Sequence, residues 1–332
     1  MIPAQQVVDL VLEAAAGVET IVLVSEHAEA SLRWAGNSMT TNGVSFSRST
    51  TVISIVRQGD SAHVGSLETT EVDPELLPEL VAASQAAARS APAARDNFEL
   101  PVGTSGPDDW DGPIAGTGAE VFGSLATELA GGFRGPDALY GFAHHTVETM
   151  FLATSTGVRR RWEQPTGSVE INAKRDGASA WAGVSTPWFA EVDAEALLAE
   201  LSTRLGWASR TVELPAGRYE TIMPPSTVSD MMIYLLWTMD GRGAQEGRTA
   251  LSAPGGGTRV GEKLSELGLT LYSDPGAPGL VCEPFVAVGS SSETVSVFDN
   301  GLDVGRVDWI RDGVINALAY PRAAAREFAV PV

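Results

Sequence analysis

The sequence predicts an α+β fold in which helix-plus-sheet units precede a mostly β C-terminal domain. Helical and strand-like segments come in blocks rather than in strict alternation, which disfavours a doubly wound parallel sheet. The 332 residues suffice for two or three compact units, each with a core of its own. Hydrophobic residues make up 44% of the chain and charged residues 19%, which is the balance of a folded protein.

Residues 1–91 are predicted to form an N-terminal α+β domain. Apolar residues at helical spacing between Pro3 and Gly17 predict an amphipathic first helix. The strands and turns expected next are residues 20–24, residues 30–34, a turn at Asn42-Gly43, residues 51–57 and a turn at Gly59-Asp60. Asp73-Pro74 predicts the start of a second helix that runs to about residue 90.

Two further units are expected after this domain. Prolines and glycines interrupt residues 92–118, which indicates a long connector. Residues 119–210 are predicted to form a second α+β unit, with a helix near residues 119–130 and another that opens at Asp193. A second antiparallel sheet is expected between these helices, from residues 139–143, 149–154, 168–173 and 179–184. A boundary at residues 207–214 leaves residues 211–332 as a third domain.

The charge balance disfavours nucleic-acid and membrane partners. Aspartate and glutamate total 42 against 22 lysines and arginines, so the formal charge is −20 and repels phosphate backbones and anionic lipids. Arg159-Arg160-Arg161 is the best basic patch, but a solvated junction between strand and loop is the favoured interpretation. The N-terminal segment has no basic part and no run of eighteen apolar residues occurs, so a cytoplasmic location is predicted.

The chain contains one cysteine, Cys282, so an internal disulfide is impossible. Its apolar neighbours predict a buried thiol on a strand. The adjacent Glu283 argues against a reactive thiolate, because thiolates form in electropositive surroundings.

No catalytic set follows from the residues alone. His144, His145 and Glu148 are the only cluster with metal-ligand character, but adjacent residues of a strand point to opposite faces, so a metal site is disfavoured. The glycine-rich residues 254–263 fail as a phosphate loop because Glu262 precedes Lys263 where glycine is required, which favours a flexible connector into a helix. No Gly-x-Ser-x-Gly elbow occurs.

A strand-like segment from Val212 leads into a helix that starts near Ser226 and reaches the sequence Trp237-Thr238-Met239-Asp240-Gly241-Arg242. In this order of elements, residues 212–275 resemble the TldD/PmbA family, also called modulator of DNA gyrase, whose peptidase members carry His-Glu-x-x-x-His on this helix. Weaker similarities at residues 32–37, 153–158, 297–301 and 312–314 extend the resemblance over nearly the whole chain.

The resemblance places degenerate residues at the motif positions. Trp237 stands in place of the first histidine, Thr238 in place of the glutamate and Arg242 in place of the second histidine. An indole has no free lone pair for a metal, a hydroxyl is no carboxylate base, and a guanidinium stays charged and repels zinc. The chain therefore resembles the TldE/PmbA-like branch that lacks the zinc motif, with no catalytic or metal-binding residue and no cofactor of its own.

The resemblance implies a non-catalytic subunit of a heterodimeric peptidase, whose TldD-like partner binds zinc and cleaves peptides. Trp237 and Arg242 would then fill space or hold a peptide carboxylate. Arg242, Asp240, Glu246 and Asp299 are the expected peptide contacts. Alternatives are a stand-alone or self-associating peptide-binding protein, and a hydrolase with a site rebuilt from Asp240, Glu246 and Asp299. Family members usually continue beyond a point like Val332, so the third domain is expected to be incomplete.

Overall fold

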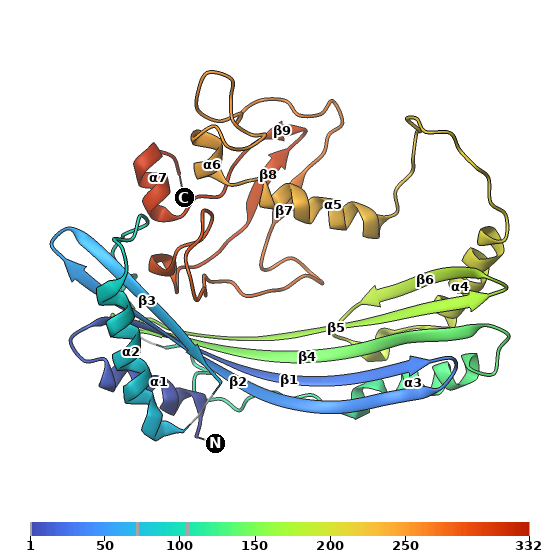
Figure 1. Cartoon of the computed structure of the whole chain (residues 1–332), viewed down its shortest axis with the longest axis horizontal. Coiled ribbons are helices and arrows are strands. Elements are labelled where there is room, and N and C mark those ends of the chain that lie inside the picture. Colours follow the sequence, from blue (N-terminus) through green and yellow to red (C-terminus); the bar gives the residue numbers. More distant parts are fainter. Residues whose placement is uncertain (1, 71–72, 104–105, 332) are drawn as a thin grey trace.

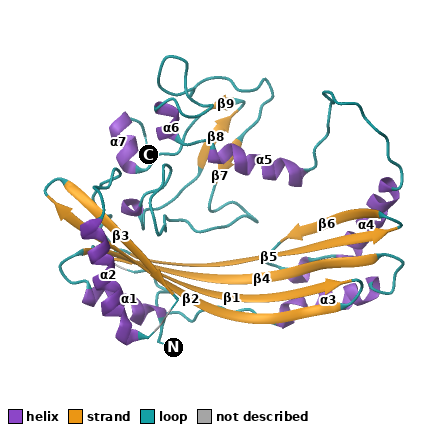
Figure 2. Ribbon diagram, in the orientation of Figure 1, coloured by secondary structure: helices purple, strands orange, loops and turns teal. Residues whose placement is uncertain are grey.

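A long, curled antiparallel sheet forms the base of the molecule (Figures 1 and 2). The computed structural model describes residues 2–70, 73–103 and 106–331. The sheet has six strands in the order β3-β2-β1-β4-β5-β6. Their bounds are β1 Glu19–Ala35, β2 Met39–Gln58, β3 Ser61–Thr69, β4 Ala138–Thr154, β5 Arg159–Arg175 and β6 Ala178–Ser185. The predicted α+β class is confirmed.

Helices cover the two ends of the sheet. At one end α1 (Ala4–Ala14) and α2 (Leu77–Ser90) pack on β1 to β3, and at the other α3 (Gly123–Gly132) and α4 (Ala194–Ala208) pack near β5 and β6. Short 3₁₀ turns are η1 (Pro74–Leu76), η2 (Ala119–Phe122), η3 (Phe189–Glu191) and η4 (Val297–Asp299). As predicted, Asp73 caps the second helical segment, with its side chain accepting a hydrogen bond from the backbone N–H of Glu75 at 3.0 Å.

The strands near α1 and α2 are buried on both faces. Val22, Val24 and Val52 belong to the core beneath α1 and α2. Ile21, Leu23 and Ile53 belong to a separate core on the opposite face, which includes Phe285, Val297 and Phe298 of the C-terminal part. Because side chains alternate along a strand, one short apolar run supplies both cores.

The predicted second sheet is wrong, because β1 pairs with β4 along almost its full length and joins both groups of strands in one sheet. The predicted turn at Asn42-Gly43 is also wrong, since Asn42 pairs with Leu32 inside the ladder of β1 and β2. The chain turns instead at Gly36 and Asn37, both at positive φ, where Asn37 Nδ2 donates to the Asp137 carbonyl at 2.8 Å. The turn at Gly59-Asp60 is confirmed. The proposed division at residues 91, 118 and 210 stays a prediction.

The C-terminal part lies above the concave face of the sheet (Figure 1). Its elements are α5 (Pro225–Trp237), α6 (Gly241–Gln245), β7 (Leu271–Ser273), β8 (Val307–Arg311), β9 (Val314–Ile315) and α7 (Arg322–Phe328). The expectation of a mostly β domain is wrong, because only three short strands occur among its described residues. The expected strand before α5 and the helix expected after residue 263 are likewise irregular chain. Within the described ranges no helix is long and apolar enough to cross a bilayer.

A close approach between strand and helix tests this packing. A Cβ atom added at Gly65 of β3 would lie 2.3 Å from the Ser84 carbonyl oxygen and 2.4 Å from the Ala88 nitrogen, both backbone atoms of α2. Gly65→Ala is expected to lower the free energy of unfolding by about 1–3 kcal/mol, because α2 must shift. Gly43→Ala is the control, since nothing lies within 4 Å of its added Cβ. Urea unfolding of both variants measures the difference, and equal stabilities would contradict this packing.

Candidate functional site

The motif positions do not lie on one helix. Helix α5 ends at Trp237, Thr238 follows as its C-cap, and Met239 turns into the core of the C-terminal part. A new helix, α6, begins at Gly241 and carries Arg242. Trp237 is 69% exposed and makes an edge contact with Tyr234, whereas Arg242 is only 5% exposed. The structure therefore separates Trp237 from Arg242, and their residue types do not fit a zinc ion.

Arg242 has acidic partners within the protein. Its Nη2 lies 2.6 Å from Glu327 Oε2 and its Nη1 lies 3.5 Å from Glu246 Oε1, while the guanidinium stacks on the Phe328 ring at 5.4 Å. The hydrogen bond to Glu327, together with the charges of both glutamates, raises the pKa of Arg242 above its usual value. A guanidinium with these partners favours the packing role over the holding of a peptide carboxylate.

The other expected peptide contacts are divided between two places. Glu246 lies beside Arg242 and binds Arg95 at 2.6 Å and Arg248 at 3.0 Å; the Arg95 hydrogen bond is the main cause that lowers the Glu246 pKa. Asp240 precedes α6, and its Oδ1 is buried without a hydrogen-bond partner among the described residues.

Asp299 lies apart from these residues and is 7% exposed. It holds the start of α7 through Arg322, whose Nε lies 2.6 Å from Asp299 Oδ1 and whose backbone N–H donates to Oδ2 at 3.1 Å. The structure thus pairs Arg242 with Glu246, leaves Asp240 at the start of α6 outside this pair, and places Asp299 in a separate ion pair.

The other sequence candidates have structural partners. His144 stacks on Phe142, while His145, on the other face of β4, is buried beside Thr117 and Phe189. No group of three or more His, Cys, Asp or Glu side chains suited to a metal occurs in the described part of the chain. Arg160 binds Asp303 at 2.7 Å and Arg161 lies 3.3 Å from Asp109 Oδ2. The arginine run therefore joins the sheet to neighbouring loops.

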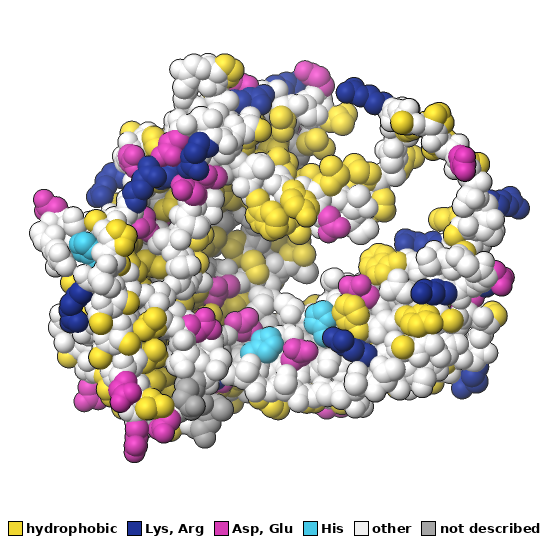
Figure 3. All heavy atoms as spheres, viewed as in Figure 1, with side chains coloured by type: hydrophobic (Ala, Val, Ile, Leu, Met, Phe, Trp, Pro, Cys, Tyr) yellow, Lys and Arg dark blue, Asp and Glu magenta, His cyan; other side chains and the backbone are white. Residues whose placement is uncertain are grey.

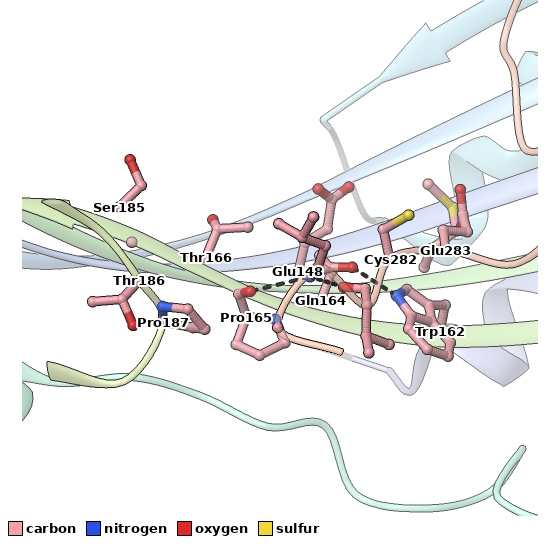
Figure 4. Close-up of a pocket in the computed structure, with 15 residues that line it drawn as sticks. Glu148, Trp162, Gln164, Pro165, Thr166, Ser185, Thr186, Pro187, Cys282 and Glu283 are labelled. Atoms are coloured by element: carbon pink, nitrogen blue, oxygen red, sulfur yellow. Dashed lines mark hydrogen bonds between the residues drawn. The ribbon is translucent and has the colours of Figure 1, made fainter. Parts of the chain in front are cut away.

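A cavity of about 530 Å³ lies between the concave face of the sheet and the C-terminal part (Figure 4). Its lining includes Glu148 of β4, Trp162 and Gln164 of β5, and residues 279–283 of a loop. Gln164 connects the two sides, because its Oε1 accepts from Trp162 Nε1 at 3.0 Å and its Nε2 donates to the Val281 carbonyl at 3.3 Å.

Cys282 lines this cavity and is exposed, so the prediction of a buried strand thiol is wrong. The apolar neighbours that suggested burial lie on a loop, where Val281 is 50% exposed. Glu283 beside it was not recognised as a site residue. Its only sequence signal was its position next to the cysteine, and its proximity to Glu148 depends on tertiary structure.

Burial raises the pKa of Glu283 to about 7, and the nearby Glu148 carboxylate adds to the effect. Glu148 itself accepts a hydrogen bond from Ser25 Oγ at 2.5 Å. The Glu283 carboxylate has no hydrogen bond or ion pair with any described residue. One end of the cavity therefore holds two carboxyl groups, of which one is poorly solvated.

The C-terminal part of the chain is similar to a known protein family. Residues 216–332 match the family model described as PmbA/TldA metallopeptidase C-terminal domain. Residues 216–332 therefore form a domain of the PmbA/TldD metallopeptidase family. This confirms the predicted resemblance, and it assigns the segment with α5, α6 and the degenerate positions to the metallopeptidase C-terminal domain. No curated protein matches the sequence.

Solved structures of PmbA/TldD-like proteins share the fold at low identity. A putative modulator of DNA gyrase from Thermotoga maritima aligns with a TM-score of 0.72 and 14% identity, over 99% of this chain and 73% of that one. TldE from Thermococcus kodakarensis aligns with a TM-score of 0.70 and 15% identity, over 99% and 72%. A putative modulator of DNA gyrase from Bacteroides thetaiotaomicron gives 0.70 and 15%, over 99% and 73%.

The ion pairs of Arg242 predict a stability effect. Arg242→Met removes the partner of Glu327 and Glu246 but keeps an apolar stem beside Phe328, so the expected loss is about 1–2 kcal/mol of unfolding free energy. Arg248→Met is the control, because Arg248 is 47% exposed and binds the same Glu246. Its expected loss is below about 0.5 kcal/mol. A larger loss for the control in urea unfolding would refute the structural role of Arg242.

Glu283 predicts a pH dependence. A carboxyl group whose pKa is raised in the folded state stabilises the fold when the pH is below its unfolded pKa. This contribution to the free energy of unfolding is lost as the pH rises through about 7. Glu283→Gln removes this titration. From pH 4 to pH 8, the free energy of unfolding of the parent is therefore expected to fall by about 1–2 kcal/mol more than that of the variant, after allowance for solvent screening. Unfolding in urea at both pH values measures this. Glu213→Gln, in the exposed linker, is expected to show no such pH-dependent difference.

Proposed function

We propose that this chain is a non-catalytic, TldE/PmbA-like subunit of a TldD-type zinc metallopeptidase complex. The observation that carries the proposal is the state of the three motif positions. Trp237 is exposed at the end of α5, Thr238 is its C-cap, and Arg242 is committed to ion pairs within α6 and α7. None of them supplies a metal ligand or a carboxylate base.

The exposed apolar surface of α5 supports the proposal of a partner chain. None of its thirteen residues is buried. Its exposed apolar side chains, here called the α5 surface, are Val228, Met231, Ile233, Tyr234, Leu236 and Trp237. Apolar side chains gather on this helix above an opening that the sheet and the linker to α4 border (Figure 3). Exposed apolar patches of this kind are typical of protein-protein contacts.

In this proposal, the α5 surface packs against a zinc-bearing TldD-like subunit, and the two chains enclose a space in which peptides are cleaved by the partner. Zinc is then expected only in the partner. The alternatives that the sequence left open are a solitary or self-associating peptide-binding protein and a hydrolase with a rebuilt site. The latter is disfavoured, because Glu246 and Asp299 are each engaged with arginines.

Co-expression tests the proposal. The tagged chain is expected to co-purify in equal amounts with a family member that carries His-Glu-x-x-x-His, with zinc in the complex and none in the chain alone, as measured by mass spectrometry of the metal content. Replacing both Tyr234 and Trp237 with serine is expected to weaken association by about tenfold or more. Phe46→Ser is the control, because Phe46 is an exposed aromatic residue of β2.

Three outcomes would count against this function. Stoichiometric zinc in the isolated chain, together with peptide cleavage, would indicate a hydrolase in its own right. A homodimer without affinity for the zinc-bearing chain would indicate self-association. A monomer that does not bind the zinc-bearing chain would favour the stand-alone peptide-binding protein.

A further inference from the structure

The cavity beneath the C-terminal part combines an acidic end with an apolar wall. Glu148 and Glu283 supply the carboxyl groups, one from the sheet and the other from the loop that covers it. The wall includes Met150 and Trp162 of the sheet and Leu280 of the loop, which is 75% exposed. The volume of about 530 Å³ lies within the range of sites for small ligands and short peptide segments.

No described basic side chain forms an ion pair with the acidic end. Ser25 donates one hydrogen bond to Glu148, but neither carboxylate forms an ion pair with a basic side chain of the described residues. A buried carboxylate without a partner is costly when ionised, so a bound cation that provides hydrogen-bond donors would relieve it. The formal charge of −20 also attracts cations to the surface.

The residues that line the cavity favour an organic ammonium group over a metal ion. A metal ion prefers several hard or imidazole ligands, and the described residues provide no cluster of three such groups here. A primary ammonium group needs only hydrogen-bond acceptors, and the carbon chain beside it gains from contact with Trp162, Met150 and Leu280. The site therefore fits an organic amine that carries an apolar group.

We propose that this cavity binds the primary ammonium group of a peptide, held between Glu148 and Glu283, with the adjacent apolar side chain against Trp162. The ammonium comes from a free N-terminus or from a lysine side chain. The choice of a peptide rests on the proposed function, but binding at this cavity requires neither the zinc-bearing subunit nor cleavage.

Cys282 offers a direct readout, because it is the only cysteine of the chain, lies exposed and lines the cavity. The rate at which a small disulfide reagent modifies its thiol is measured in the full-length chain with increasing peptide. Leucyl-leucine amide, which has a free N-terminus, is expected to slow the reaction by about fivefold or more at saturation, because the occupied fraction approaches one. Its N-acetylated form is expected to leave the rate unchanged.

A third peptide separates the two sources of the amine. N-acetyl-leucyl-lysine amide has its only ammonium on the side chain. Protection by this peptide identifies lysine recognition, whereas protection by leucyl-leucine amide alone identifies recognition of the N-terminus. Either result supports the ammonium site.

Two variants test the carboxylates. Glu283→Gln is expected to raise the Kd of the protecting peptide by about tenfold, and Glu148→Gln is expected to act in the same direction, because each loses a charge-assisted hydrogen bond. Glu213→Gln, in the exposed linker, is expected to keep the parent Kd. Calorimetric titration of the same peptides checks that the change reflects binding rather than thiol chemistry.

Equal protection by the acetylated and free peptides would overturn the ammonium site, since apolar contact alone would then suffice. Absence of protection and of heat with every peptide would overturn the cavity as a peptide site. The comparison of free and acetylated peptides uses the parent chain alone, so its result holds whether or not the variants fold. A failure here with successful co-purification of the zinc-bearing partner would leave the proposed function intact.

Discussion

The two-sided burial of strands β1, β2 and β4 near α1 and α2 is the interaction on which the rest of the structure depends. Val22 and Val24 face the helices, and Ile21 and Leu23 face the C-terminal part. Phe298 is fully buried on that second face. Each such side chain contributes about 1.5–3 kcal/mol when buried. This second core fixes the C-terminal part over the concave face and so creates the cavity beside it.

Ion pairs stabilise the C-terminal part internally, and Arg95 attaches it to the preceding connector. Arg322 joins Asp299 to the start of α7, and Arg95 joins the connector to Glu246 beside α6. Arg242, at a predicted motif position, binds Glu327 of α7. The Arg242 guanidinium therefore pairs with carboxylates of the same chain. This ion pair joins α6 to α7.

The apolar residues of α5 and the carboxylates of the cavity differ in their surroundings. The α5 surface exposes large apolar groups to solvent, which is unfavourable unless another molecule covers them. Glu148 and Glu283 are half-buried, and neither forms an ion pair with a basic side chain in the described part of the chain. These two features motivate the proposed partner chain and the proposed peptide ligand.

The sequence by itself determined the α+β class and the resemblance to the PmbA/TldD family. The class follows from local periodicity and caps, such as Asp73 before α2, because these depend on nearby residues. The chemistry of Trp237, Thr238 and Arg242 follows from residue type alone. Tertiary structure decided that Asn42 stays within a strand, because pairing with Leu32 outweighs the turn preference of Asn-Gly. It also exposed Cys282 and brought Glu148 near Glu283, since contacts between residues 135 positions apart have no local signal in the sequence.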